Sequence, residues 1–341
     1  MKTAHDKRKA FRENLRSGRF MIAPGIYDAL SAKVAEAAGL PCLAMGGYAI
    51  SASRLGEPDV GLLPLSEMTE ALKQICDATD IPVIGDGDTG YGNALNVLRT
   101  EQEYEKAGAS CIFFEDQVWP KRCGHMEGKA VISAEEHAEK IRAACDARID
   151  RETLIMARTD ARAVNGIEDA VRRGHLYAEA GAEALFIEAL RDRGEVERIA
   201  REFEGTGVHL FANMIEGGKT PIISARELQA MGYAGVFWSC ASLYMVTKTL
   251  FDNFSTLAKE GTSESFLGDL MPFGEFNRFI GLEIIFDKYQ IDAPQNPISQ
   301  AYPQHKAPRS YEPQRRFSIS SDYLPSVTSS GFSTNFRSPL R

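Results

Sequence analysis

Short runs of apolar, β-branched residues alternate along this chain with amphipathic segments of about 12 to 18 residues. This alternation is typical of repeated βα units built around a parallel sheet. Eight of the apolar runs are predicted to be strands, at residues 20–23, 42–45, 82–85, 110–114, 153–157, 184–187, 209–212 and 235–238. A doubly wound sheet would seldom use eight consecutive parallel strands, so the pattern predicts a closed (β/α)8 TIM barrel.

The amphipathic segments predict the helices that separate these strands. They lie at residues 29–38, 66–78, 94–107, 134–147, 167–180 and 226–231. The basic segment 1–19 leads to no apolar signal core, so it is interpreted as a helix and not as a targeting sequence. Two more helices, at 241–259 and 263–279, exceed what eight βα units need, and they predict extra helices after the barrel.

Composition changes near residue 300. From residue 301 onward the chain has nine serines, five prolines, and six Lys or Arg residues against two acidic ones. A segment of this composition cannot bury enough apolar surface to fold alone. The chain is therefore predicted to have a catalytic barrel domain over residues 1–292 and a disordered, basic, Ser/Pro-rich tail over residues 293–341.

The charge balance argues against two classes of partner. The 39 Lys and Arg residues against 47 Asp and Glu residues give a net charge of -8, which would repel nucleic acid and anionic membranes. The apolar stretches are too short or too polar for a membrane span. Six cysteines without a C-x-x-C pair suit reduced thiols, so a cytoplasmic location without disulfides is expected.

Polar residues follow one predicted strand after another. They are Gly46, Gly47, Asp86, Asp88, Glu115, Asp116, Arg158, Asp160, Glu188 and Asn213. Any one Asp or Asn could simply cap the next helix. Their recurrence at strand after strand favours an active site, because the carboxyl ends of barrel strands meet at one mouth.

The segment Gly85-Asp86-Gly87-Asp88-Thr89-Gly90 matches the G-x-G-x-x-G dinucleotide pattern. Two aspartates inside such a loop would repel a pyrophosphate, so this interpretation is rejected. Paired carboxylates suit Mg²⁺, which keeps several waters and takes few protein ligands. Asp86, Asp88 and Glu115 are therefore predicted to hold Mg²⁺, mostly through water, and Mn²⁺ could replace it.

The loop after Glu115 has the sharpest local signal. Its cysteine, Cys123, is flanked by Lys121, Arg122 and His125, and three cations would lower the pKa of a thiol, so a reactive cysteine is expected. Zinc binding by Cys123 and His125 is the alternative, although no second ligand pair is evident.

Several motifs, in this order, resemble the isocitrate lyase/phosphoenolpyruvate mutase superfamily over roughly residues 11–290. They are Pro24-Gly25-Ile26-Tyr27-Asp28-Ala29-Leu30-Ser31-Ala32, Leu55-Gly56-Glu57-Pro58-Asp59, Asp86-Gly87-Asp88-Thr89-Gly90-Tyr91-Gly92, Glu115-Asp116-Gln117, Lys121-Arg122-Cys123-Gly124-His125 and Ala157-Arg158-Thr159-Asp160. Residues 212–221 are similar to the branch of carboxyvinyl-carboxyphosphonate phosphorylmutase, 2-methylisocitrate lyase and 2,3-dimethylmalate lyase.

The resemblance implies a Mg²⁺-dependent carbon-carbon lyase that cleaves a 2-substituted malate or isocitrate-type acid into an α-keto acid and a carboxylate. It implies a last helix swapped between subunits, in a homodimer or homotetramer. It also implies a mobile gating loop at residues 121–125. The implied catalytic residues are Cys123 as proton donor, Lys121, His125, Arg158 and Glu188. The implied residues for binding a small di- or tricarboxylic acid are Gly46, Gly47, Tyr48, Asp59, Arg158, Asn213 and Trp238.

Two positions depart from the superfamily pattern. Ala44 and Gly46 stand where lyases usually have tyrosine and serine or threonine, which leaves the general base unassigned, with Tyr48 as a candidate substitute. Trp238 stands near the usual proline or serine and is expected to reduce the pocket. A smaller substrate keeps oxaloacetate hydrolase or decarboxylase as an alternative, beside the phosphorylmutase and a non-catalytic binding protein.

Overall fold

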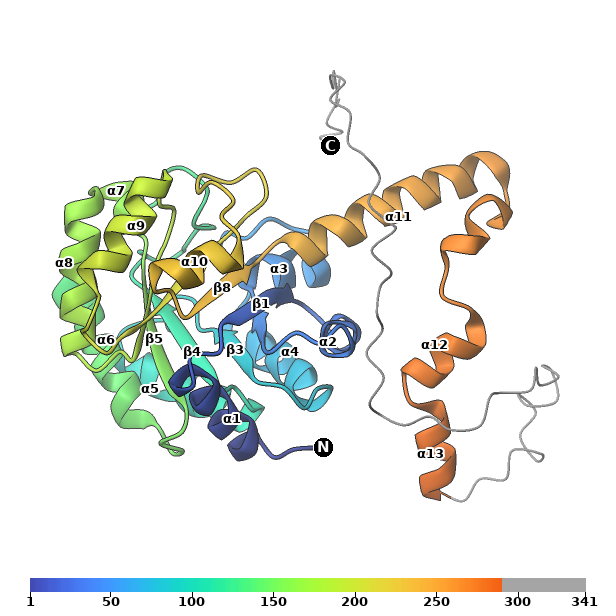
Figure 1. Ribbon diagram of the computed structural model, residues 1–341, viewed down its shortest axis with the longest axis horizontal. Helices are drawn as coiled ribbons and strands as arrows, with labels where there is room; N and C mark the ends of the chain where they lie inside the picture. The colour runs from blue at the N-terminus through green and yellow to red at the C-terminus, as the bar shows by residue number, and fades with distance from the viewer. Residues whose placement is uncertain (290–341) are drawn as a thin grey trace. The chain divides into compact units, whose positions relative to one another are not determined.

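Eight parallel strands close into a barrel in which each strand pairs with the next and β8 pairs with β1. The strands are β1 (Met21–Ile26), β2 (Leu43–Met45), β3 (Val83–Asp86), β4 (Cys111–Glu115), β5 (Leu154–Thr159), β6 (Ala184–Ile187), β7 (His209–Asn213) and β8 (Gly235–Trp238). This computed structural model, which describes residues 1–289, confirms the predicted (β/α)8 TIM barrel (Figure 1).

Helices cover the outside of the barrel and continue beyond its last strand (Figure 1). The first ten are α1 (Ala4–Arg16), α2 (Ala29–Ala37), α3 (Gly47–Leu55), α4 (Leu65–Asp77), α5 (Ala94–Ala107), α6 (Ala134–Ala147), α7 (Ala161–Val164), α8 (Ile167–Glu179), α9 (Arg193–Glu202) and α10 (Ala225–Met231). After β8 follow α11 (Ala241–Glu260), the 3₁₀ helix η1 (Glu264–Asp269), α12 (Phe273–Phe279) and α13 (Leu282–Tyr289).

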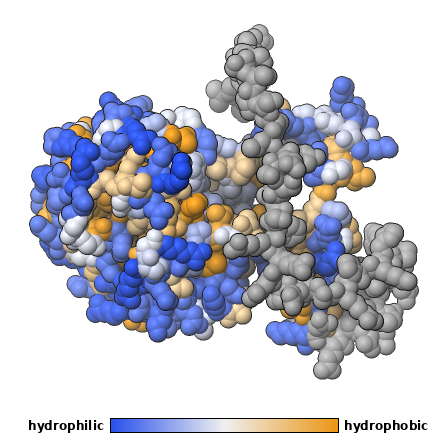
Figure 2. Space-filling model, in the orientation of Figure 1, coloured by the Kyte–Doolittle hydropathy of each residue, from blue (hydrophilic) through white to orange (hydrophobic). Residues whose placement is uncertain are grey.

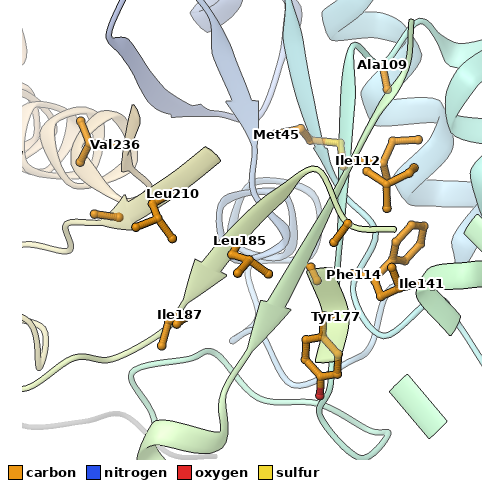
Figure 3. Close-up of a cluster of buried hydrophobic side chains, with 14 of the residues drawn as sticks. Met45, Ala109, Ile112, Phe114, Ile141, Tyr177, Leu185, Ile187, Leu210 and Val236 are labelled. Carbon is orange, nitrogen blue, oxygen red and sulfur yellow. The ribbon is translucent and has the colours of Figure 1, made fainter. Parts of the chain in front are cut away.

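Two apolar layers hold the barrel together. Inside it, Phe113, Phe186 and Phe211 pack around Phe237, and the rings of Phe211 and Phe237 stack at 5.4 Å. The outer layer fills the space between strands and helices, where aliphatic side chains predominate (Figure 3). Because side chains alternate along a strand, Phe237 belongs to the inner layer and its neighbour Val236 to the outer one.

Helix α1 seals the amino-terminal end of the barrel. Phe11 is fully buried in the inner apolar layer. Lys7 donates to the Cys76 carbonyl at 2.7 Å, and Arg8 donates to the Ala109 carbonyl at 2.8 Å, which links the helix to the ends of α4 and α5. The predicted amino-terminal helix is thus observed, and the opposite end of the barrel is left for the site.

The segment after β8 differs from the prediction in one respect. The prediction of a single helix at residues 263–279 is wrong, because η1 ends at Asp269 and α12 begins after Pro272. Proline lacks an N–H donor and restricts the residue before it, so a continuous helix cannot pass through Pro272. The predicted tail at 293–341 lies outside the described residues. Within residues 1–289, no helix is both long and apolar enough to cross a membrane.

Candidate active site

A cavity of about 50 Å³ lies among the carboxyl ends of the strands. Its lining includes the two predicted glycines and eight other predicted site residues, namely Tyr48, Asp59, Asp86, Lys121, Cys123, Arg158, Glu188 and Asn213. A space of this size holds only a few water molecules. The segment that covers it, residues 117–131 between β4 and α6, is called the flap, and it lies closed over the strand ends in this structure.

Three predicted metal carboxylates come from the ends of β3 and β4. Asp86 and Asp88 are 5% and 3% exposed, and Glu115 is fully buried. The two Asp86 oxygens accept hydrogen bonds from the backbone N–H groups of Gly47 at 2.9 Å and Asp88 at 3.0 Å. Burial raises the pKa of Asp88 to about 6 and that of Glu115 well above its usual value. Carboxylates in this environment are stabilised as anions only by a nearby cation.

The carboxylate of Glu115 fits a role as a metal ligand. Neither of its oxygens has a hydrogen-bond partner, and its ion pair joins Oε2 to Arg158 Nη1 at 3.1 Å. Within residues 1–289, no three His, Cys, Asp or Glu side chains come close enough to bind an ion directly. Because Mg²⁺ retains much of its water shell, this set of residues suits an ion that is held largely through water.

Arg158, at the end of β5, is surrounded by acidic side chains. Its guanidinium group contacts Glu115 at 3.1 Å, Asp160 at 2.9 Å and Glu188 at 3.6 Å, and it lies 5.1 Å above the ring of Phe186. These charges keep its pKa well above the ordinary value despite burial. A planar group held on several sides offers a fixed pair of donors for a substrate carboxylate.

The flap is bound to the barrel by two of its predicted catalytic residues. Lys121 Nζ lies 2.7 Å from both Asp59 Oδ1 and Asp88 Oδ1. His125 Nδ1 accepts from the Lys219 backbone N–H at 2.8 Å, and its Nε2 lies 3.0 Å from Glu188 Oε1. A nitrogen that accepts carries no proton, so the ring proton of His125 lies on Nε2, which donates to Glu188.

The structure corrects the expected pKa of Cys123. Burial raises the pKa of this thiol to about 11, although the backbone N–H of His125 opposes the rise. The cations that were expected to lower it act elsewhere, because Lys121 is paired with carboxylates and Arg122 donates to the Glu127 carbonyl. Cys123 is therefore a protonated thiol at neutral pH, which suits a proton donor better than a nucleophile.

This raised pKa predicts a distinct pH dependence for alkylation of Cys123. Only the thiolate reacts, so the rate with iodoacetamide should rise about tenfold per pH unit up to near pH 10. The rate is to be measured by mass spectrometry of the peptide that contains Cys123. A plateau near pH 9, as expected for an ordinary thiol with a pKa of about 8.5, would contradict it.

The remaining wall combines predicted and unpredicted residues. Asn213 donates to Glu188 Oε2 at 3.0 Å and accepts from Ser239 Oγ at 2.7 Å. Tyr48, which lines the cavity, packs edge-on against Tyr244 of α11 with ring centroids 6.4 Å apart. The Gly47 N–H was expected to face a substrate carboxylate, but it is engaged by Asp86.

The predicted role of Trp238 is wrong. Its side chain packs against the outer apolar layer, whereas Phe237 and Ser239 line the cavity. The reason is the alternation of β8, in which Gly235 and Phe237 point inward and Trp238 points outward. The same alternation could have identified Phe237 and Ser239 from the sequence.

Asp116, which follows Glu115, joins β4 to β5 and α8. Its carboxylate accepts four hydrogen bonds, from Thr159 Oγ1 at 2.7 Å, the Asp160 N–H at 2.9 Å, Tyr177 at 2.8 Å and Arg173 at 3.0 Å. Sequence reasoning placed it at the mouth but gave it no role. The Asp116 carboxylate holds the backbone immediately after Arg158 in place, so it stabilises the position of Arg158 without lining the cavity.

Replacing Asp116 with alanine should lower the free energy of unfolding by about 3 to 5 kcal/mol, because Arg173 loses its fully buried partner and the buried Thr159 and Tyr177 hydroxyls lose their acceptor. Asp169, which pairs with the same Arg173 at 2.7 Å but is partly exposed, provides the matched control. Asp169→Ala should cost less, in the range of exposed pairs. Equal losses in urea unfolding would show that burial at Asp116 is not decisive.

The chain matches a family model described as phosphoenolpyruvate phosphomutase over residues 11–257. The 2,3-dimethylmalate lyase of Eubacterium barkeri is 46% identical over 274 residues, covering 80% of this chain and 94% of that protein. A 2-methylisocitrate lyase of Aeropyrum pernix is 42% identical over 270 residues, covering 79% and 86%.

Solved structures agree with these matches. An oxaloacetate acetylhydrolase bound to 3,3-difluorooxalacetate has a TM-score of 0.79 and 30% identity, covering 84% of this chain and 97% of its own. A phosphonopyruvate hydrolase bound to oxalate and Mg²⁺ has a TM-score of 0.76 and 30% identity, covering 84% and 98%. The predicted superfamily is confirmed, and so is the prediction of an enzyme whose relatives are named lyases. The chain belongs to the phosphoenolpyruvate phosphomutase family.

Proposed function

We propose that this protein is a Mg²⁺-dependent carbon-carbon lyase. Its substrate class is a 2-substituted malate or isocitrate-type acid, similar to 2,3-dimethylmalate or 2-methylisocitrate, which is cleaved into an α-keto acid and a carboxylate. The observation that carries the proposal is the protonated thiol of Cys123, with a pKa of about 11, lining one cavity with Arg158. Relatives named for this chemistry support it.

Mg²⁺, or Mn²⁺ in its place, is proposed to be held by Asp86, Asp88 and Glu115, largely through water. The bound ion supplies Lewis acidity toward the hydroxyl and carboxylate oxygens at the keto-acid end of the substrate. The buried carboxylate of Glu115, whose oxygens have no hydrogen-bond partner, supports this assignment. The similar structure of a phosphonopyruvate hydrolase with oxalate and Mg²⁺ supports it as well.

Protein side chains are proposed to bind the substrate and to donate the proton that completes the reaction. Arg158 binds a substrate carboxylate and stabilises the negative charge that develops there. The substrate O–H passes its proton to a base of the cavity wall, for which Tyr48 is proposed. A carbonyl then forms, the carbon-carbon bond breaks, and its electron pair moves into the departing carboxylate fragment as an enolate. Cys123 then donates its S–H proton to the enolate carbon, and the closed flap keeps water from competing.

Other residues hold these groups in place. Glu188 receives hydrogen bonds from His125 of the flap and from Asn213. The bond from His125 and the charge of Arg158 keep the pKa of Glu188 low against the effect of burial. Lys121 connects the flap to Asp59 and Asp88. Gly46, Gly47 and Tyr48 complete the wall beside the substrate.

Ser239 favours a second candidate, hydrolysis of oxaloacetate to oxalate and acetate. Its hydroxyl group lines the small cavity and bonds to Asn213. A polar wall at this point suits a hydrated keto group better than a branched alkyl substituent. The structural similarity to an oxaloacetate acetylhydrolase supports this alternative.

One substrate panel separates these functions. 2-Methylisocitrate, isocitrate, 2,3-dimethylmalate, oxaloacetate and carboxyphosphonoenolpyruvate are incubated with Mg²⁺ or with EDTA, and the products are identified by mass spectrometry. Cleavage of a malate-type acid only with Mg²⁺ supports the lyase. Oxalate from oxaloacetate supports the hydrolase, a product with a new carbon-phosphorus bond to pyruvate supports the mutase, and no product from any compound supports a non-catalytic binding protein.

The segment from α11 to α13 is proposed to dock on a second copy of the chain, giving a cytoplasmic homodimer or homotetramer. None of the residues of α11 is buried. Large apolar side chains along the segment are more than half exposed (Figure 2), and they are Met245, Phe251, Phe254, Leu267, Met271, Phe273 and Ile284. A surface of this kind marks an interface, and an arm exchanged between subunits would cover it.

A double variant of the arm tests this assembly. Phe251→Asp combined with Phe254→Asp should reduce the mass in light scattering to that of one 37.5 kDa chain, because two charges cannot be buried in an apolar contact. Leu95→Asp changes an equally exposed apolar residue on α5 and should leave the mass unchanged. A wild-type protein that is already monomeric would overturn the proposal.

A further inference from the structure

Lys129 lies near the carboxyl-terminal end of the flap, and its side chain is almost completely buried. Only 2% of the side chain is exposed, although its neighbours Gly128 and Ala130 are exposed. Its ammonium group lies 2.8 Å from Asp160 Oδ1 and also donates to the Gly124 carbonyl. A buried ammonium group is costly unless it is paired, so the flap can adopt this position only with the pair formed.

Asp160 connects this lysine to the substrate-binding arginine. Its Oδ2 accepts from Arg158 Nε at 2.9 Å, and its Oδ1 accepts from Arg158 Nη2 at 3.3 Å as well as from Lys129. The backbone N–H of Asp160 donates to Asp116 at 2.9 Å, so the chain at Asp160 is fixed to the barrel wall. One carboxylate thus holds a flap cation and a barrel cation together.

The second partner of Lys129 is the backbone of the segment that carries the Cys123 thiol. Gly124 follows Cys123, and its backbone lies directly against Arg158 and Glu188. A Cβ at Gly124 would lie 2.6 Å from Arg158 Nη2 and 2.5 Å from Glu188 Cγ, closer than atoms can approach. The glycine is required for this contact, and the bond from Lys129 holds its carbonyl in place.

We propose that Lys129 is a positioning residue that connects closure of the flap to the orientation of Arg158. Its ammonium group binds Asp160 only when the flap is closed, and Asp160 then holds Arg158 while Gly124 presents Cys123. A third lysine pair at the flap, Lys219 with Glu127, is exposed on its Glu127 side and contributes little. The role of this ion pair in catalysis rests on the proposed lyase function, but its role in holding the flap closed does not.

The test measures flap closure without any substrate. The rate of alkylation of Cys123 by iodoacetamide is followed by peptide mass spectrometry in full-length wild type, Lys129→Met, Lys129→Gln and Lys129→Arg. Loss of a buried ion pair should raise the rate by about tenfold or more in the Met and Gln variants. Lys129→Arg keeps the charge and should restore most of the protection. Glu127→Gln, which breaks only the exposed pair, should react at the wild-type rate.

A pH profile gives another measure of flap opening. Opening removes Cys123 from the burial that raises its pKa, so the rate should rise and its plateau should move toward that of an ordinary thiol. The proposal is overturned if Lys129→Met and Lys129→Gln react at the wild-type rate, or if Glu127→Gln gives the same increase.

Turnover provides the second measurement. A misplaced Arg158 should raise KM and lower kcat together in Lys129→Met, and Lys129→Arg should recover both. A purely structural defect would reduce only the active fraction, so that kcat falls with KM unchanged, which would contradict positioning. If the substrate panel gives no product, the proposed function fails while the alkylation rates still decide whether Lys129 holds the flap.

Discussion

Replacing Cys123 with serine should lower kcat for carbon-carbon cleavage by about 10²- to 10⁴-fold, the contribution expected of a positioned general acid. The thiol is protonated at neutral pH, because burial raises its pKa to about 11. A serine hydroxyl has nearly the same shape but holds its proton far more tightly, so protonation of the enolate carbon becomes slow. The quantity to measure is steady-state kcat with product identification, and KM should change little.

Cys145→Ser is the matched control for this variant. Cys145 lies on α6, where its Sγ donates to the Gly181 carbonyl, and it is not part of the cavity lining. The same substitution there should leave kcat at the wild-type value. Full turnover of a malate-type substrate by Cys123→Ser would remove Cys123 from its proposed role and favour a reaction that needs no such proton donor.

Glu115→Gln is expected to have an effect of similar size. The change removes one negative charge but keeps the shape, so Arg158 loses its 3.1 Å partner and the ion loses a carboxylate. Metal binding to the folded state raises stability by about 2.7 kcal/mol at 100 times the dissociation constant, so Mg²⁺ should raise the Tm of the wild type by several degrees. The variant should lose both this shift and activity.

Glu101→Gln controls for the loss of a buried carboxylate elsewhere. Glu101 on α5 is fully buried, its oxygens have no hydrogen-bond partner, and burial raises its pKa well above the usual value. Its replacement should therefore leave the Mg²⁺-dependent shift in Tm intact. A Glu115→Gln protein that still responds to Mg²⁺ as the wild type does would exclude Glu115 from the metal site.

The barrel could be predicted from the sequence because its apolar runs are short, repeated and separated by clear helical periodicity. The strands at 184–187 and 235–238 and the helices at 94–107 and 134–147 have the predicted bounds. Helix α9 was not predicted, since its sequence is short, highly charged and contains Gly194. Local patterns identify elements of this kind only when several apolar positions recur.

The gathering of polar side chains at one end of the barrel was predictable from the sequence, but their electrostatics were not. The rule that barrel sites lie at the carboxyl ends of strands located Asp86, Glu115 and Arg158. The pKa of Cys123 was predicted wrongly because the basic residues next to it in sequence were assumed to lie close to its thiol in the folded chain. Lys121 is in fact paired with Asp59, which is 62 residues away, and only the folded chain reveals that contact.

Cleavage in deuterium oxide tests the central claim most directly. If Cys123 protonates the enolate carbon under a closed flap, the carboxylate product formed from 2,3-dimethylmalate should contain one deuterium at its α-carbon, in a single configuration, as determined by NMR. Incorporation should be lost in the presence of EDTA together with cleavage itself. Product with deuterium in both configurations, or cleavage that continues without a divalent ion, would contradict the account.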